Sequence, residues 1–202
     1  MQVNTARLTI RPLKRADVDA MAVWQPFADP MLAKYNLPDQ SVKERDDWFA
    51  LRTGDLARRE FAIEASGQVV GRISLRDRDG RGHARLGISI GAEFVNHGFG
   101  TEALIGFLDW YFGEGGFSAM ALDVSAANRR AVQVYQKLGF RHVMDFYQPV
   151  GDEAIVAFLD DPRYVDLRIY FRREDGQTSA LFYEMELTRE EWQERKEVID
   201  RG

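Results

Sequence analysis

The fold of this chain is decided by the stretch Phe94-Val95-Asn96-His97-Gly98-Phe99-Gly100-Thr101-Glu102-Ala103-Leu104. Gly98 and Gly100 stand directly before residues whose apolar side chains recur at helical spacing, which predicts a tight turn that opens a helix. The first turn of a helix leaves backbone N–H groups without partners and carries the positive end of the helix dipole. Such a turn attracts phosphate groups. We expect the apolar side of this helix to be formed by Ala103, Leu104, Phe107, Leu108, Tyr111 and Phe112.

A second stretch predicts another helix, and it reads Asn128-Arg129-Arg130-Ala131-Val132-Gln133-Val134-Tyr135-Gln136-Lys137-Leu138-Gly139-Phe140. Asn128 is a favourable N-cap residue, and Gly139 is a typical stop just beyond a helix end. Tyr135 falls on the apolar side of this helix. Taken alone, that position favours a core aromatic residue over a chemical role.

One strand and two helices are predicted near the start of the chain. The strand covers Leu8 to Leu13, and the first helix covers Asp17 to Gln25. Ser41 and Glu44 have the spacing of a capping box, which places the start of the second helix there. We expect the apolar side of that second helix to consist of Trp48, Phe49 and Leu51.

After the second helix the hydrophobic period changes to two, which predicts three successive antiparallel strands. The first and second strands are joined by the Ser66-Gly67 turn, and the second and third by the polar, glycine-rich segment 77–82. The third strand runs from Ala84 to Ile90, directly before the glycine turn.

The rest of the chain alternates between strands and helices. A short strand around Met120 to Val124 links the two quoted stretches, and two later strands are expected over Leu167 to Arg172 and Ser179 to Leu187. Thr188 and Glu191 form another capping box, so the chain is expected to close with a helix.

These elements predict an α/β fold with an α+β mixed sheet: an antiparallel meander leads into a βαβα unit, and helices cover both faces. A C-terminal β-hairpin and helix form an extension. We expect a single domain over residues 1–202, with a core of about 7–144 and an extension of about 145–202.

Composition excludes several classes of protein. The net charge of −5 argues against a nucleic-acid binder, which needs clustered Lys and Arg. The absence of cysteine excludes disulfides, thiolate metal sites and a Cys nucleophile, and the His residues are too scattered for a metal site. No segment approaches the ~20 apolar residues of a membrane span, and the N-terminus lacks the pattern of a signal peptide. We therefore expect a cytoplasmic protein without a membrane or nucleic-acid partner.

Two other interpretations of the glycine turn deserve comparison. A lone G-x-G is most often a plain loop whose glycines have a steric purpose. Gly98, Gly100 and Ala103 also fit a dinucleotide-binding G-x-G-x-x-A pattern, with Asp123 as its later acidic residue. That second interpretation is weakened because Glu93 to His97 separate the strand from the first glycine, and because the preceding strands are expected to be antiparallel.

Together and in this order, the two quoted stretches resemble the acyl-CoA-binding core of the GNAT superfamily of N-acetyltransferases. The resemblance covers roughly Leu8 to Phe140. The family's pyrophosphate motif is Gln/Arg-x-x-Gly-x-Gly/Ala, in which Gly98 and Gly100 match while Val95 occupies the leading position. The opening strand and the late Glu190-Glu191-Trp192 look most like the ribosomal-protein N-terminal and spermidine acetyltransferases.

The resemblance implies acetyl-CoA as co-substrate and a role for each matching residue. Backbone groups of Ile88 and Ile90 would hold the pantetheine arm, the glycine turn would cradle the pyrophosphate, and Asn128 would bond a pantetheine amide. Tyr135 would protonate the departing thiolate. The implied cofactor-binding residues are Ile88, Ile90, Asn96, His97, Gly98, Phe99, Gly100, Thr101, Asn128 and Tyr135.

The general base is where this chain departs from the family. Many relatives carry a Glu at the place of Arg85, which cannot accept a proton. The candidates for the base are His83, Ser89 through a water, Glu93 and Asp123, of which His83 and Ser89 are named beside Tyr135 as the expected catalytic residues.

The expected activity is transfer of an acetyl group to a primary amine, either a small polyamine-like molecule or a protein N-terminus, by direct attack. The acceptor is expected to be cationic because carboxylates and aromatic residues crowd the segment 145–166. The alternatives are a non-catalytic acyl-CoA-binding module and a scaffold that forms a homodimer through the extension. The carboxylates of that segment are Asp145, Asp152, Glu153, Asp160, Asp161 and Asp166.

Overall fold

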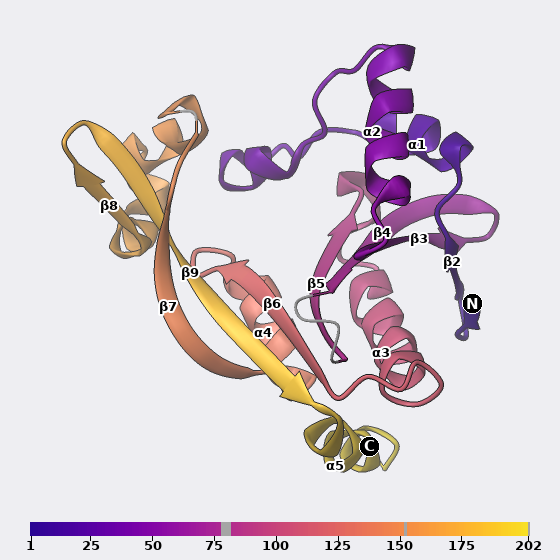
Figure 1. The fold of residues 1–202 in the computed structure, drawn as a ribbon. Coiled ribbons are helices and arrows are strands. Elements are labelled where there is room, and N and C mark those ends of the chain that lie inside the picture. Colours follow the sequence, from indigo (N-terminus) through magenta and orange to yellow (C-terminus); the bar gives the residue numbers. More distant parts are fainter. Residues whose placement is uncertain (78–81, 152, 202) are drawn as a thin grey trace. The chain divides into compact units, whose positions relative to one another are not determined.

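The computed structural model describes residues 1–77, 82–151 and 153–201, drawn as a ribbon in Figure 1. The chain divides into two compact units. Unit 1 contains Met1–Pro26, Leu37–Met120 and Thr188–Gly202, and unit 2 contains Phe27–Asn36 and Ala121–Leu187. The single domain with an extension from about residue 145 stays a prediction, and the division into units does not follow that boundary.

Unit 1 is built on an antiparallel meander, as the hydrophobic period predicts. Its strands follow one another in the sheet, and Ile10 lies opposite Ile63 while Ile73 lies opposite Ile88. Segment 78–81, most of the predicted polar loop, is outside the described residues. The strands are β1 (Val3–Asn4), β2 (Leu8–Pro12), β3 (Arg58–Ala65), β4 (Gln68–Asp77) and β5 (His83–Ile90).

Helices cover both faces of this meander. Consecutive strand residues point to opposite faces, and on β3 the Phe61 ring packs edge-on against Phe107 of α3, whereas Ala62 belongs to a core cluster with Val18 and Met21 of α1. The helices of unit 1 are α1 (Arg15–Ala22), α2 (Val42–Gly54), α3 (Phe99–Phe112) and α5 (Arg189–Ile199), with a short 3₁₀ turn η2 (Ala92–Phe94).

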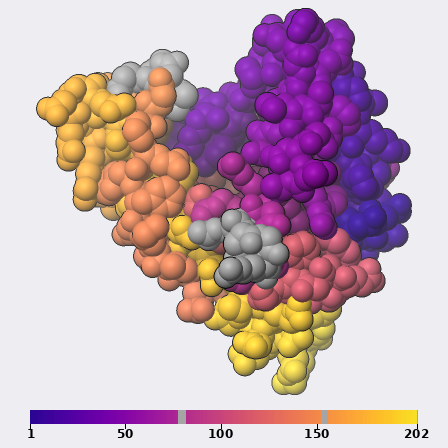
Figure 2. All heavy atoms as spheres, viewed as in Figure 1, coloured from indigo at the N-terminus to yellow at the C-terminus, as the bar shows by residue number. Residues whose placement is uncertain are grey.

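The helix ends of unit 1 follow their capping residues. Ser41 and Glu44 form the predicted capping box of α2, and Thr188 and Glu191 form that of α5. The predicted apolar set of α3 is confirmed, because all six of its residues are buried. The prediction for α2 is wrong at Leu51, which is 75% exposed on a helix that lies at the molecular surface in Figure 2. α1 also ends at Ala22, earlier than predicted.

Unit 2 is organised around the long strand β9, which lies between β6 and β7 in the sheet. β7 and β8 both pair with β9 in antiparallel register, and β8 joins β9 through a turn with positive φ at Asp175 and Gly176. Its elements are η1 (Pro30–Tyr35), most of β6 (Ala119–Ser125), α4 (Arg129–Lys137), β7 (Arg141–Pro149), η3 (Glu153–Asp160), η4 (Pro162–Tyr170), β8 (Phe171–Glu174) and most of β9 (Gln177–Thr188).

The strand predicted over Leu167 to Arg172 is wrong from Leu167 to Tyr170. Those residues end the 3₁₀ helix η4, and β8 begins only at Phe171. η4 begins at Pro162, because the Asp161 side chain accepts a hydrogen bond from the Arg163 N–H and proline suits the first helical position. Among the helices that the structure describes, none has the length and apolar character needed to cross a bilayer.

Candidate functional site

The glycine turn of unit 1 presents open backbone donors. Asn96 has φ 65° and Gly98 has φ 80°, so the chain turns through left-handed conformations that Asn and Gly tolerate best. Gly98 is the N-cap of α3, and the first helical hydrogen bond runs from the Glu102 N–H to the Gly98 carbonyl at 3.0 Å. The N–H groups at 99–101 therefore have no acceptor within the helix, and no side chain in the described residues caps this end.

A cluster around Glu102 fixes the turn from behind. The Glu102 carboxylate accepts hydrogen bonds from Thr5 Oγ1 at 2.6 Å, from the Arg7 backbone N–H at 2.8 Å and from Arg7 Nε at 2.6 Å. The Arg7 guanidinium also donates to the His97 carbonyl at 3.0 Å and lies 4.9 Å from the Phe99 ring centre. Arg7 thereby ties the N-terminal segment to the turn.

This cluster also keeps Glu102 ionised and compensates its negative charge at the start of α3. Burial alone would raise the pKa of Glu102, but the hydrogen bonds from Thr5 and Arg7 and the Arg7 charge lower it. A carboxylate in the first turn would oppose a bound phosphate, and here an ion pair of 2.6 Å with Arg7 compensates it. The sequence analysis missed Arg7, whose partner lies 95 positions away.

The two glycines have different reasons to be glycine. A Cβ at Gly98 would force a side chain into the left-handed region and would lie 3.2 Å from Arg7 Nη2. A Cβ at Gly100 would meet only Ile90 Cγ1 at an ordinary 3.6 Å, and the backbone there has no positive φ. The fold therefore does not require glycine at Gly100, whereas close approach of a ligand would. The residues of this turn fit a pyrophosphate.

The predicted residues of β5 lie at opposite ends of that strand. Ile88 and Ile90 are half-buried near its end and lie opposite Ile73 and Gly71 of β4. The exposed Ser89 lies close to them. His83 begins the strand, so it lies roughly 20 Å from Ser89 at about 3.3 Å per residue. The structure places these two alternative candidates for the base far apart on β5, and the choice between them stays a prediction.

In unit 2, Asn128 has the N-cap role that its residue type predicts. Its Oδ1 accepts a hydrogen bond from the Ala131 N–H at 3.2 Å. Its Nδ2 points the other way, to the hydroxyl of Tyr35 at 3.5 Å. Tyr35 comes from η1, and the sequence analysis did not single it out. The residues next to it in the sequence give no sign of a contact 93 positions away.

Tyr135 lies on the same helix and faces both the core and Tyr35. Its ring packs edge-on against Phe140 at 5.7 Å between centres. Burial raises the pKa of its phenol above the ordinary value, and the Tyr35 hydroxyl adds to this effect. The phenol therefore keeps its proton at neutral pH. No hydrogen bond to the Tyr135 hydroxyl is found within the described residues, so that proton is available to a ligand.

The remaining candidates for the base have different surroundings. Glu93 accepts a hydrogen bond from the Gln25 N–H at 3.1 Å, which gives its carboxylate a structural task. Asp123 is half-buried in β6, and Arg85 lies opposite Arg76 on β4. Within the described part of the chain, no group of His, Asp and Glu side chains could hold a metal ion.

Two carboxylates of segment 145–166 pair with arginines, and a third contacts a histidine. Asp145 pairs with His142 at 2.6 Å, Asp161 with Arg163 at 2.6 Å, and Asp166 with Arg129 at 2.7 Å. Asp160 is exposed, Asp152 lies outside the described residues, and the side chain of Glu153 is likewise not described. The arginine pairs neutralise Asp161 and Asp166, so these two carboxylates attract a cationic ligand less strongly than the composition predicts.

The family follows from comparison with known proteins. A family model described as an acetyltransferase (GNAT) domain matches residues 7–141 of the chain. The chain belongs to the GNAT acetyltransferase family. This confirms the resemblance read from the two quoted stretches, and it makes the protein an acetyl-CoA-dependent N-acetyltransferase with the mixed α/β fold of that family.

Similar proteins include spermidine acetyltransferases. The chain is 26% identical to spermidine N(1)-acetyltransferase of Escherichia coli (strain K12) over 132 residues, which is 65% of this chain and 71% of that protein. Among solved structures, spermidine N-acetyltransferase from Vibrio cholerae in complex with CoA and spermine aligns with TM-score 0.68 and 19% identity, covering 93% of this GNAT chain and 99% of the other. A GNAT-family acetyltransferase from Bacillus anthracis aligns with TM-score 0.67 and 16% identity, covering 94% and 99%.

Proposed function

We propose that this GNAT enzyme acetylates a primary amine of a polyamine-like molecule. The likeness to spermidine acetyltransferases supports this class of acceptor. The observation that carries the cofactor half of the proposal is the first turn of α3, which follows a left-handed Gly98 and has no side-chain cap, so that the N–H groups at 99–101 lack an acceptor within the helix. That arrangement suits the pyrophosphate of acetyl-CoA.

The residues named in the sequence divide the binding of acetyl-CoA among them. The turn from Asn96 to Thr101 holds the pyrophosphate, with Arg7 compensating the charge of Glu102. Backbone groups of Ile88 and Ile90 and the amide of Asn128 bond the pantetheine arm. The Asn128 Nδ2 already donates to Tyr35 at 3.5 Å, a long contact that a pantetheine carbonyl could replace.

The chemistry is a direct attack. The acceptor amine loses a proton to solvent or to a nearby base and its nitrogen adds to the acetyl carbonyl; the carbon–sulfur bond then breaks. The thiolate receives a proton from the phenol of Tyr135, which burial keeps protonated at neutral pH, and solvent reprotonates the phenolate before the next turnover. Ser89, exposed near the end of β5, stays the candidate that relays the amine proton through a water.

The test is release of free thiol from acetyl-CoA in the presence of an amine panel. Spermidine and spermine are expected to be acetylated with a higher kcat/KM than a peptide with a free α-amine or an uncharged primary amine. Turnover of the peptide alone would move the acceptor to a protein N-terminus. CoA binding without thiol release from any amine would contradict the enzymatic proposal and favour a non-catalytic acyl-CoA-binding module.

Two finer features accompany this proposal. A homodimer is supported by the exposed apolar residues Val143 and Met144 on β7, which is the last strand in the sheet order of the described residues. Sedimentation of the purified chain is the direct check on it. A cytoplasmic location stays a prediction from the sequence.

A further inference from the structure

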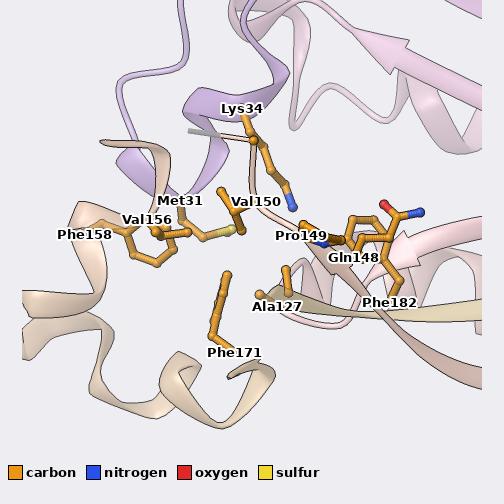
Figure 3. A pocket seen from close by; sticks show the side chains of 12 residues that line it. Met31, Lys34, Ala127, Gln148, Pro149, Val150, Val156, Phe158, Phe171 and Phe182 are labelled. Atoms are coloured by element: carbon orange, nitrogen blue, oxygen red, sulfur yellow. The ribbon is translucent and has the colours of Figure 1, made fainter. Parts of the chain in front are cut away.

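A cavity of about 160 Å³ lies wholly within unit 2 and is shown in Figure 3. Its wall is mostly apolar and includes three aromatic rings, Phe158, Phe171 and Phe182. It begins next to the N-cap of α4, because Ala127 lines it. Of the lining side chains that the structure describes, Lys34 is the only charged one.

The Lys34 side chain extends from η1 into this cavity (Figure 3). Its ammonium lies 5.1 Å from the centre of the Tyr35 ring and 5.2 Å from that of Phe182. Within the described part of the chain it forms no ion pair and no hydrogen bond. Lys34 is half-buried. Cation–π contacts compensate the lost hydration of its charge only in part, and burial lowers the pKa of Lys34 to about 8. The ammonium therefore has no counter-ion among the described residues, and an anionic ligand could supply one.

We propose that this cavity binds a small apolar carboxylate, whose hydrocarbon part fills the aromatic wall and whose anionic group pairs with the ammonium of Lys34. Charge complementarity favours an anionic ligand. A cationic ligand would be repelled by Lys34, and the described lining side chains include no carboxylate to bind it. An apolar cavity of about 150 Å³ accommodates a benzene ring, so the volume here suits one ring or a chain of similar size.

The carboxylate could belong to a separate small acid or to the acceptor amine itself. In the second case the inference rests on the proposed function and changes the acceptor from a plain polyamine to an amine that also carries a carboxylate. Binding can be measured without acetyl-CoA and without turnover. Failure of this inference and failure of the proposed acetyl transfer are therefore distinguishable.

The experiment compares three probes of one shape by calorimetric titration: phenylacetate, the neutral phenylacetamide and the cationic benzylamine. Phenylacetate is expected to bind about 10- to 100-fold more tightly than phenylacetamide, the range expected for a hydrogen bond to a charged group. Lys34→Met should abolish this preference while leaving phenylacetamide unchanged, and Lys34→Arg should keep it. Lys43→Met is the matched control, since Lys43 lies on α2 and pairs with Asp47.

Two further variants secure the assignment. Met31→Trp places a larger side chain on the cavity wall and should weaken both phenylacetate and phenylacetamide. Asp152 and Glu153 lie in the sequence between the lining residues Gly151 and Val156, and their side chains are not described. Asp152→Asn combined with Glu153→Gln removes these two carboxylates. Phenylacetate should bind this variant at least as well as the wild type.

Three results would overturn the proposal: equal affinity for phenylacetate and phenylacetamide, unchanged phenylacetate binding by Lys34→Met, or tighter binding of benzylamine than of phenylacetate. Which molecule carries the carboxylate is decided by adding phenylacetate to a spermidine acetylation assay. Competition with the amine indicates that the carboxylate belongs to the acceptor, and non-competitive inhibition or no effect indicates a separate ligand.

Discussion

At the residue scale, the surroundings of Tyr135 decide what its phenol can do. Burial and the neighbouring Tyr35 raise its pKa, so the group holds its proton more tightly than an exposed tyrosine. A cysteine thiol, taken here as the reference for a thiol, has a pKa of about 8.5, so proton transfer from this phenol to a fully formed thiolate is uphill. We therefore expect donation to occur as the carbon–sulfur bond breaks and charge develops on sulfur.

Replacement of Tyr135 by Phe tests this role. The change keeps the ring that packs on Phe140 and removes only a hydroxyl that no described residue bonds. Because a general acid typically contributes about 10²- to 10⁴-fold, kcat should fall by that factor while CoA affinity and Tm stay nearly constant. Steady-state kinetics, calorimetric titration and thermal unfolding measure the three quantities. Wild-type turnover in Y135F would make Tyr135 a core residue only.

The residues of the candidate site differ in how far the sequence predicts them. Asn128 and Gly98 are readable because their roles depend on neighbours a few positions away. Tyr35 and Arg7 are not, because their partners lie 93 and 95 positions away and only folding brings them together. His83 and Ser89 stay alternative candidates for the base, because residue type suggests both and the strand holds them far apart.

At the element scale, helix α3 shows how local sequence and function compete. Gly98 is required by backbone geometry, whereas Gly100 occupies a helical position with space for a Cβ. Glycine in a helix interior costs roughly 0.5–1 kcal/mol relative to alanine, and this is an upper bound for Gly100 because it lies in the first turn. Retaining Gly100 therefore lowers stability, and the compensating gain is expected in binding.

The two glycines should consequently respond in opposite directions to alanine. G100A should raise the free energy of unfolding by at most roughly 0.5–1 kcal/mol. It should weaken CoA binding by about tenfold or more, because its methyl group occupies the space of the pyrophosphate. G98A should lower stability by roughly 1–2 kcal/mol, the cost of a left-handed alanine. Urea denaturation and calorimetric titration separate the effects. A G100A protein with wild-type CoA affinity would refute this pyrophosphate site.

Elements with explicit end signals were predicted well from the sequence. The capping boxes at Ser41 and Thr188 start helices, and Gly139, with φ 98°, ends α4 as its position suggests. The segment Leu167 to Tyr170 was misread because its alternating apolar residues suit a strand. The Asp161-Pro162 start signal before it was the better guide.

At the scale of the whole molecule, the desolvated ammonium of Lys34 affects the free energy of unfolding. Its pKa is lowered to about 8 in the folded chain, against about 10.4 in the unfolded chain. Between these values the unfolded chain binds more protons, so this group makes stability rise with pH across that window. Tyr35, the titratable neighbour, has a raised pKa of its own.

K34M should therefore be more stable than the wild type at pH 7, by up to about 3 kcal/mol less the lost cation–π contacts. The difference should shrink as pH rises from 8 towards 10. Urea denaturation at several pH values gives the comparison. The control K43M should not show this shrinking advantage, because Asp47 raises the pKa of Lys43. A pH-independent difference for K34M would contradict the lowered pKa.

The grouping into two units could not be predicted from the sequence. Residues 27–36 lie between two helices of unit 1 along the chain, yet they belong to unit 2 with residues 121–187. No turn signal or change in composition marks that assignment, since it depends on contacts such as the one from Tyr164 to Asp29, 135 positions apart.

The pairing of β7 with β9 has a practical consequence for protein engineering. The family signature ends at residue 141, where β7 begins, whereas the strand that completes β7 lies some forty positions later. α5 likewise returns to α3, where Trp192 Nε1 donates to Asp109 at 3.1 Å. A chimera that transplants only the signature segment into a relative would expose a bare strand edge and leave α3 without its cover. Exchange of modules within this family therefore has to carry the C-terminal hairpin and helix along.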